Sequence, residues 1–182
     1  QANKRKKIIK SERQKKKKKK MYFYNLKHKE EQLNFKEATI KGQGKDKGLF
    51  FPEDISKFSN EFLQNLPNLS NEEIAFQVMK DFAGDEIPEA ELRKIVAETI
   101  AFEIPLKKVT ENISVLELFH GPTLAFKDVG ARFMSRCLGY FLKNETRKVT
   151  VLVATSGDTG GAVANGFYDV EGIEVVILYP KN

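Results

Sequence analysis

The chain has 182 residues, 41% of them hydrophobic, which is enough for one or two compact domains. Its formal net charge is +6, but residues 1–20 alone carry +11, which leaves −5 for residues 21–182. An acidic body repels phosphate backbones and argues against a nucleic-acid partner. No apolar run approaches the roughly 20 residues of a membrane span. The single cysteine excludes a disulfide framework or a cysteine-based zinc site and points to the reducing cytoplasm.

Residues 1–20 form a basic leader that ends in six lysines, Lys15 to Lys20. Like charges at this density repel one another and stay solvated, so the sequence predicts a disordered segment. The apolar stretch of about 7 to 15 residues that a signal peptide needs is missing. Because Met21 follows directly, we expect it to be the native start and the leader to be non-native. The alternatives are a solvated tail without a specific role and a localisation or nucleic-acid signal.

Residues 21–112 are expected to form a mainly helical N-terminal region with a few short strands. A short aromatic strand opens it, and a helix is predicted over about residues 30–40. Three further helices are predicted to begin at Ser59, at Ser70 and at Pro88, from their capping residues. The apolar residues of the last helix recur at helical spacing, which is typical of a core face.

From residue 113 the pattern changes to alternating strands and helices. The predicted elements are a strand over 113–119, a helix over 126–141, a buried parallel strand over 148–155, a helix over about 162–170 and a second buried strand over 173–180. The last three elements make one βαβ unit. Its loop lies at the carboxyl end of a strand, where open α/β sheets bind ligands. We therefore expect residues 113–182 to be the start of an α/β domain.

The loop of this unit, "SGDTGG" (156–161), is a candidate anion site. Backbone N–H groups at a helix N-terminus favour anions, and glycines let a ligand approach the main chain. A nucleotide P-loop would need a lysine after the glycines, and a dinucleotide loop would need Gly-x-Gly-x-x-Gly; neither is present. Spacing alone leaves open a simple strand-to-helix turn with Thr155 or Ser156 as the N-cap.

Lys127 lies between a Gly-Pro turn and the predicted helix, beside apolar neighbours such as Phe126 and Val129. Partly apolar surroundings disfavour an ammonium ion and leave a free amine that can form a Schiff base. Taken alone, a solvated lysine on the first turn of a helix is the simpler interpretation. An anion loop about thirty residues later shifts the balance, because pyridoxal phosphate (PLP) chemistry needs both an amine and anion sites.

The segments "LELFHGPTLAFKDVGARFM" and "TSGDTGGAVA" together resemble the threonine synthase family. The resemblance continues in "YNLK", "GLFFP" and "GDEIP" and so covers residues 21–182. It implies an α/β, fold-type-II PLP-dependent enzyme, similar to the β subunit of tryptophan synthase. It also implies the cofactor pyridoxal 5′-phosphate and no metal.

Site residues follow from the resemblance motif by motif. Lys127 of "AFKD" is implied to be the catalytic residue and to carry the cofactor as a Schiff base. The loop is implied to bind the amino-acid carboxylate and to lie against the cofactor ring. Its implied cofactor-binding residues are Ser156, Gly157, Asp158, Thr159 and Gly160, and its implied substrate-binding residues are Thr155, Ser156 and Thr159. Many relatives of this fold type have Asn at the position of Asp158, whereas Asp matches the threonine synthase branch.

The implied reaction converts O-phospho-L-homoserine and water to L-threonine and phosphate, the last step of threonine biosynthesis. We expect the chain to be the front part of such an enzyme and to be inactive alone. The loop for the cofactor phosphate and the contact to the pyridine nitrogen are expected beyond Asn182. The alternatives are a sibling PLP lyase such as threonine dehydratase, or an inactive fragment with a polybasic binding tail. The sequence leaves the oligomeric state open.

Five other residues have candidate roles. Cys137 lies on the apolar stripe of its helix and is expected in the core. His28 is expected on the surface among charged neighbours. His120 is interpreted either as a structural hydrogen-bonding residue or as a contact to cofactor or substrate. Asp128 and Arg132 either orient the lysine helix or meet the substrate phosphate.

Overall fold

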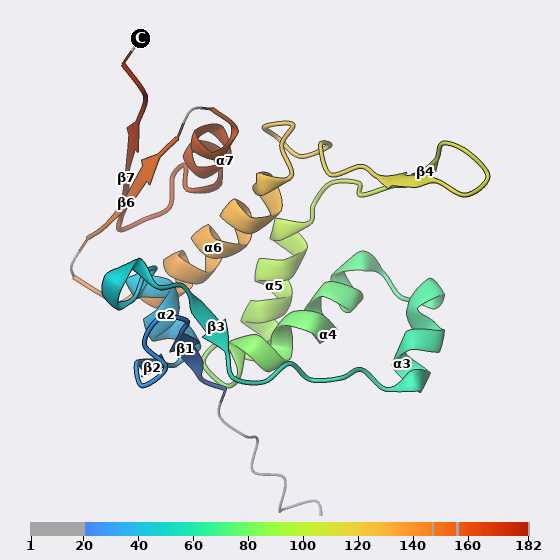
Figure 1. Ribbon diagram of the computed structural model, residues 1–182, viewed down its shortest axis with the longest axis horizontal. Coiled ribbons are helices and arrows are strands. Elements are labelled where there is room, and N and C mark those ends of the chain that lie inside the picture. Colours follow the sequence, from blue (N-terminus) through green and yellow to red (C-terminus); the bar gives the residue numbers. More distant parts are fainter. Residues whose placement is uncertain (1–20, 147, 156, 182) are drawn as a thin grey trace, which may run out of the picture.

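The computed structural model describes residues 21–146, 148–155 and 157–181, so the predicted leader lies outside the described residues. The described chain opens with a small antiparallel sheet of order β2-β1-β3 (Figure 1). Its strands are β1 (Phe23–Asn25), β2 (Gln32–Leu33) and β3 (Phe50–Pro52). Phe23 pairs with Leu33 on one side and with Pro52 on the other. The short aromatic strand predicted for this end is confirmed.

Helices dominate the rest of the N-terminal region. They are α2 (Phe35–Lys41), α3 (Asn60–Asn65), α4 (Asn71–Ala83) and α5 (Glu89–Thr99), with 3₁₀ turns η1 (Lys45–Lys47) and η2 (Leu66–Asn68). Ser59 and Ser70 each accept a hydrogen bond from a backbone N–H three residues later, as predicted for caps. The helix predicted over 30–40 is wrong in its first half. Asn34 and Glu37 form a capping box that starts α2 at Phe35, and β2 precedes it.

The βαβ unit is confirmed, with different bounds. It consists of β6 (Val149–Ala154), α7 (Asp158–Gly166) and β7 (Ile173–Leu178). The two strands are parallel, with Val149 opposite Ile173 and Ala154 opposite Leu178. Helix α7 begins at Asp158, four residues before the predicted start, because the two glycines of the loop enter the helix. The preceding helix, α6 (Lys127–Leu142), lies where it was predicted.

The prediction that both strands of this unit are buried is wrong for the described residues. Residues of β6 alternate between half-buried and exposed, and Leu152 and Leu178 are 64% and 51% exposed. Within the described chain the sheet has two strands, and α7 contacts both. The β-branched run therefore has the composition of a buried strand, although half of its side chains remain accessible.

A hairpin accounts for the strand predicted over 113–119. Strand β5 (Ser114–Leu116) is shorter than predicted and pairs antiparallel with β4 (Leu106–Lys108), which was not predicted. Every residue of both strands is exposed. The hairpin projects from the helical body (Figure 1).

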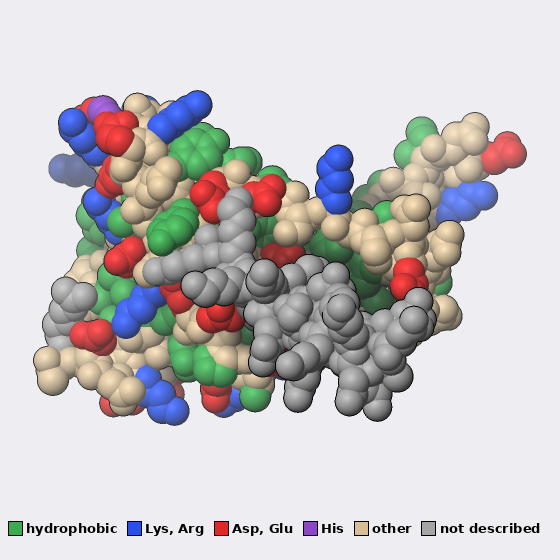
Figure 2. All heavy atoms as spheres, turned by 90° about the horizontal axis from the view of Figure 1, so that it is seen from below, with side chains coloured by type: hydrophobic (Ala, Val, Ile, Leu, Met, Phe, Trp, Pro, Cys, Tyr) green, Lys and Arg blue, Asp and Glu red, His purple; other side chains and the backbone are tan. Residues whose placement is uncertain are grey.

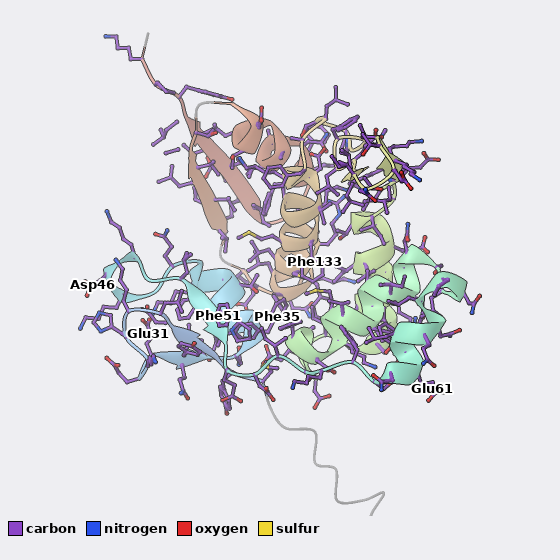
Figure 3. The ribbon with its side chains drawn as sticks, turned by 45° about the vertical axis from the view of Figure 1, so that its right-hand side comes forward. Glu31, Phe35, Asp46, Phe51, Glu61 and Phe133 are labelled. Atoms are coloured by element: carbon purple, nitrogen blue, oxygen red, sulfur yellow. The ribbon has the colours of Figure 1, made fainter. Side chains whose placement is uncertain are left out.

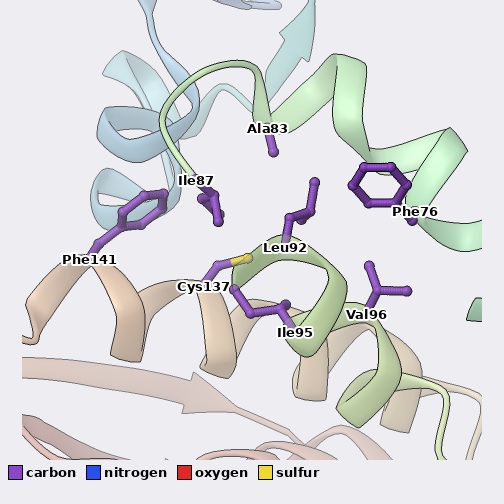
Figure 4. Packing of buried hydrophobic residues seen from close by; sticks show 8 residues of the cluster. All are labelled: Phe76, Ala83, Ile87, Leu92, Ile95, Val96, Cys137 and Phe141. Atoms are coloured by element: carbon purple, nitrogen blue, oxygen red, sulfur yellow. The ribbon is translucent and has the colours of Figure 1, made fainter. Parts of the chain in front are cut away.

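The hydrophobic core lies between α4, α5 and α6. Its buried members are Phe76, Ala83, Ile87, Leu92, Ile95, Val96, Cys137 and Phe141 (Figure 4). Full burial of an aliphatic or aromatic side chain stabilises by about 1.5–3 kcal/mol. The core thus joins α6, which begins with Lys127, to the helices before residue 112.

Aromatic contacts extend this core to α2. The ring centre of Phe35 lies 6.0 Å from that of Phe141 and 6.5 Å from that of Phe133. Phe35 and Phe133 lie between α2 and α6 in Figure 3. The lysine helix is therefore packed on one side by the whole helical region.

Candidate functional site

Lys127 is the first residue of α6, and its side chain is half-buried. Its Nζ lies 5.4 Å from the centre of the Phe126 ring. Within the described ranges, the amine makes no hydrogen bond and no ion pair. The structure therefore places an amine without a polar partner at the start of a helix, in the partly apolar setting that the sequence predicted.

The turn before Lys127 is held by the next residue, Asp128. Its carboxylate accepts hydrogen bonds from the backbone N–H and the hydroxyl of Thr123, at 2.9 and 2.5 Å. A Cβ atom on Gly121 would lie 2.5 Å from an Asp128 oxygen, so only glycine fits there. The Asp128 side chain is only 1% exposed. Of its two interpretations, this geometry favours the orienting one.

The predicted anion loop connects β6 to α7. Thr155 Oγ1 accepts a hydrogen bond from the Gly157 N–H at 3.2 Å, and the Gly157 carbonyl accepts from Gly160 and Gly161. The N-cap of α7 is Gly157, and not Thr155 or Ser156 as in the alternative of a simple turn. Thr155 instead holds the loop from one residue before it, and Ser156 lies outside the described residues.

Space and packing differ along this loop. A Cβ atom on Gly157 or Gly161 would meet no atom within 4 Å, whereas one on Gly160 would lie 2.7 Å from the Thr155 methyl group. Gly160 is therefore a packing residue, and the main chain on either side of it is open to a ligand. Asp158 is exposed and Thr159 half-buried in the first turn of α7.

The two parts of the candidate site lie on neighbouring helices. Helix α7, which begins at the loop, packs against α6, which begins at Lys127 (Figure 1). A close contact between Gly166 and Ala131 joins them. The amine and the loop thus belong to one packed helix pair.

Two further candidates have structural partners. His120 Nε2 lies 2.7 Å from a Glu117 oxygen, and its ring stacks on that of Phe119. Arg132 donates to the backbone carbonyl of Glu98 through Nε and Nη2, at 3.1 and 2.6 Å. Burial and then the nearby Arg136 lower the Arg132 pKa below its usual range. Arg132 thereby joins α6 to the end of α5, whereas His120 contacts near neighbours in the sequence.

The remaining two candidates lie away from this pair. Cys137 is fully buried, as predicted, and burial raises its thiol pKa to about 12. His28 is half-buried rather than on the surface, because its ring lies between Asp46 (2.6 Å) and Glu30 (3.3 Å). The three residues join the β1–β2 turn to η1 and have no contact with the candidate site.

A hollow of about 620 Å³ opens elsewhere, between α2 and the end of α4, and contains none of the candidate site residues. On the coloured part of the face in Figure 2, acidic and basic side chains are interspersed, without a continuous basic patch. Among the described residues, no cluster of three or more His, Cys, Asp or Glu could hold a metal ion. No described helix is long and apolar enough to cross a membrane.

The residues present fit PLP chemically. Lys127 offers an amine for an aldehyde, and the start of α7 offers backbone donors for a carboxylate or phosphate, with open space beside Gly157 and Gly161. Sequence reasoning found both parts. It missed Thr123, which fixes the turn before Lys127, because a hydrogen bond between a loop side chain and a helix side chain leaves no periodic signal.

Comparison with known proteins agrees with this arrangement. Residues 22–100 match the protein family described as "Threonine synthase N terminus". The chain is 49% identical over 161 residues to threonine synthase of Haemophilus influenzae, covering 88% of this chain and 37% of the relative. Threonine synthase of Escherichia coli is 45% identical with the same coverage. The chain thus spans little more than a third of the length of these relatives.

Solved structures are similar in fold as well as in sequence. The crystal structure of threonine synthase from Escherichia coli superimposes with a TM-score of 0.82 at 44% identity, covering 88% of this chain and 37% of that one. PLP-bound threonine synthase from Brucella melitensis also gives 0.82, at 36% identity, covering 89% and 36%. The expected α/β fold is confirmed. Over 88% of its own length the chain is therefore similar to threonine synthases, and its residues 22–100 match the N-terminal part of that family.

Proposed function

We propose that this chain supplies the cofactor-bearing lysine and the carboxylate-binding loop of a PLP-dependent threonine synthase. The reaction is the conversion of O-phospho-L-homoserine and water to L-threonine and phosphate. The observation that carries the proposal is the amine of Lys127, without a polar partner among described residues, on a helix packed against the helix that begins at the loop. The relatives of this chain are named threonine synthases, and one of them is PLP-bound.

PLP, when bound, supplies an electron sink for charge that develops at the substrate α-carbon. Lys127 would hold it through Nζ. Once Nζ is released from the cofactor by the amino group of the substrate, its free amine would be the base that takes the proton from the α-carbon. One side chain therefore has two duties, to hold the cofactor and to move a proton.

The loop binds the substrate carboxylate. Backbone N–H groups of Asp158 and Thr159 begin α7, where the helix dipole favours an anion. Thr159 is half-buried and can add its hydroxyl, while Thr155 fixes the loop through Gly157. The proposed role of Ser156 rests on the family motif alone. Gly157 leaves room for a ligand beside the main chain, and Gly160 allows α7 to pack closely against Thr155.

The proposed location is the cytoplasm, where a small phosphorylated amino acid is available and thiols stay reduced. The buried free thiol of Cys137 supports this proposal.

A genetic complementation tests the function. The full-length protein encoded by the reading frame of this chain is expressed in bacteria that lack threonine synthase. We expect growth without added threonine for wild type and for the control Lys148→Arg, and none for Lys127→Arg, because a guanidinium cannot attack an aldehyde. Folded wild-type protein that fails to restore growth would contradict the proposal. Purified protein that deaminates threonine but ignores phosphohomoserine would favour the sibling dehydratase.

A further inference from the structure

Helix α7 carries the candidate loop at one end and is attached to the molecule at the other. At its last residue, Gly166, a Cβ atom would lie 3.0 Å from the carbonyl carbon of Ala131, 3.1 Å from its oxygen and 3.2 Å from its methyl group. Two of these three atoms belong to the backbone of α6, which cannot turn away as a flexible side chain can. Gly166 therefore allows α7 to approach α6 more closely than any other residue would.

Ala131 lies four residues after Lys127, one turn further along the same helix. The close contact thus occurs near the lysine end of α6. A displacement of α7 at Gly166 changes the placement of the whole nine-residue helix, and the loop at its start moves with it. The separation between the loop and Lys127 depends on this contact.

Arg136 fixes the same end of α7 by a hydrogen bond. Its Nη1 donates to the Gly166 carbonyl at 2.7 Å and to Ser135 Oγ at 2.9 Å. A cation at a helix C-terminus is favourable, because the last carbonyls carry a partial negative charge. The guanidinium is held in turn by the Glu98 carboxylate, at 3.3 Å from Nε.

Glu98 belongs to α5, in the region that matches the family's N terminus. Its backbone carbonyl accepts from Arg132, and its carboxylate pairs with Arg136. Two arginines of α6, Arg132 and Arg136, therefore attach the end of α5 to α6. Arg136 also bonds to the end of α7. Through Arg136, the N-terminal region is connected to the helix that carries the loop.

We propose that Gly166 and Arg136 are positioning residues, which set the distance and angle of the 157–161 loop relative to Lys127. The inference rests on the proposed function in one respect, that the loop binds the substrate carboxylate. Neither residue touches the ligand. A displaced α7 weakens carboxylate binding in the ground state and the transition state alike, which raises KM with little change in kcat.

The test compares Gly166→Ala and Arg136→Gln with wild type in the full-length protein. We expect KM for O-phospho-L-homoserine to rise roughly tenfold, since a displacement of about 1 Å can cost up to a hundredfold. Cofactor attachment at Lys127 should stay complete, because neither substitution alters Lys127 or the turn before it that Asp128 holds. Arg136→Lys should recover part of the KM, since one amine can reach the Gly166 carbonyl but cannot also contact the Glu98 carboxylate as the separate Nε of arginine does.

Ile95→Val is the matched control, because it weakens the α5 core without touching α7. It should lower the melting temperature and leave KM unchanged at a temperature where the protein is folded. If Gly166→Ala fails to fold, Arg136→Gln and Arg136→Lys carry the same test. A KM that follows melting temperature across all variants would overturn the proposal.

Amide hydrogen exchange separates this inference from the proposed function. In both main variants the amides of Gly160 and Gly161, which bond to the Gly157 carbonyl, should exchange at least threefold faster. The middle of α6 should exchange as in wild type. Unchanged exchange in the loop overturns the positioning role whether or not the protein makes threonine. Faster exchange in a protein without threonine synthase activity would reject the function and keep the positioning role.

Discussion

The helical region and the βαβ unit differ in how they are stabilised. Helices α4, α5 and α6 share a core of fully buried side chains, whereas no residue of β6 or β7 is fully buried and every second residue of β6 is exposed. Yet the βαβ unit carries the candidate loop, and only the first residue of α6 brings chemistry to the helical side. The buried core of this chain therefore lies mainly in one region and half of its candidate site in the other, as is common for binding loops.

The largest change in stability is expected when a core side chain is removed. Leu92 is 2% exposed and lies between α4 and α6, so Leu92→Ala should lower the free energy of unfolding by about 2–5 kcal/mol. The matched change Leu152→Ala, on the accessible face of β6, should alter it by less than about 0.5 kcal/mol. Urea titration of both variants measures the difference. Equal losses would show that the strand is as well packed as the core.

Asp128 lies in the first turn of α6 and holds the turn before it, and its removal should have the next largest effect. Asp128→Ala leaves the N–H and hydroxyl of Thr123 without their acceptor, which should cost about 1–3 kcal/mol. Thr123→Val removes one of these hydrogen bonds and should cost less, and Thr123→Ser should be close to wild type. Thermal unfolding checks this order. A stable Asp128→Ala protein would mean that the turn before Lys127 needs no support.

The sequence predicted the regular parts of both regions and failed where loops or glycines interrupt them. Helix α6 was predicted within a residue at each end, because its apolar stripe is continuous. The start of α7 was missed because glycine has a low helix propensity, although Gly160 and Gly161 are helical here. Strand β4 was missed because "LKK" has no alternation of apolar and polar residues.

The candidate site also has parts that the sequence predicted and parts that it could not predict. Lys127 and the loop could be found because short motifs carry them. Gly166 and Arg136 could not be found, since a helix–helix approach and a side-chain bond to a distant carbonyl depend on tertiary structure.

A pH titration measures how much Glu31 contributes to the stability of the N-terminal region. Hydrogen bonds from Asn25 and then Lys41 lower the pKa of Glu31 from 4.5 to about 2. A carboxyl whose pKa is lowered on folding stabilises above its unfolded pKa, and this contribution is lost as the pH falls from about 4.5 to about 2. Glu31→Gln should therefore destabilise at neutral pH and show a smaller loss of stability between these pH values. Parallel acid-unfolding profiles of the two proteins would contradict this assignment.

The smallest effect is expected at Cys137. Burial raises the pKa of its thiol to about 12, so little thiolate is present at neutral pH. A disulfide reagent should leave Cys137 unmodified in the folded protein and modify it fully in urea, as peptide mapping can show. Fast modification under native conditions would mean that the core between α5 and α6 opens. This would contradict the full burial of Cys137.

The most direct measurement concerns Lys127 itself. The full-length protein is incubated with PLP, reduced with borohydride and digested, and the labelled peptide is identified by mass. We expect one label on Lys127 in wild type and none in Lys127→Arg, with Lys143 and Lys148 unlabelled in both. A label on another lysine, or a Lys127→Arg protein that still binds PLP covalently, would contradict the assignment of the cofactor-bearing residue.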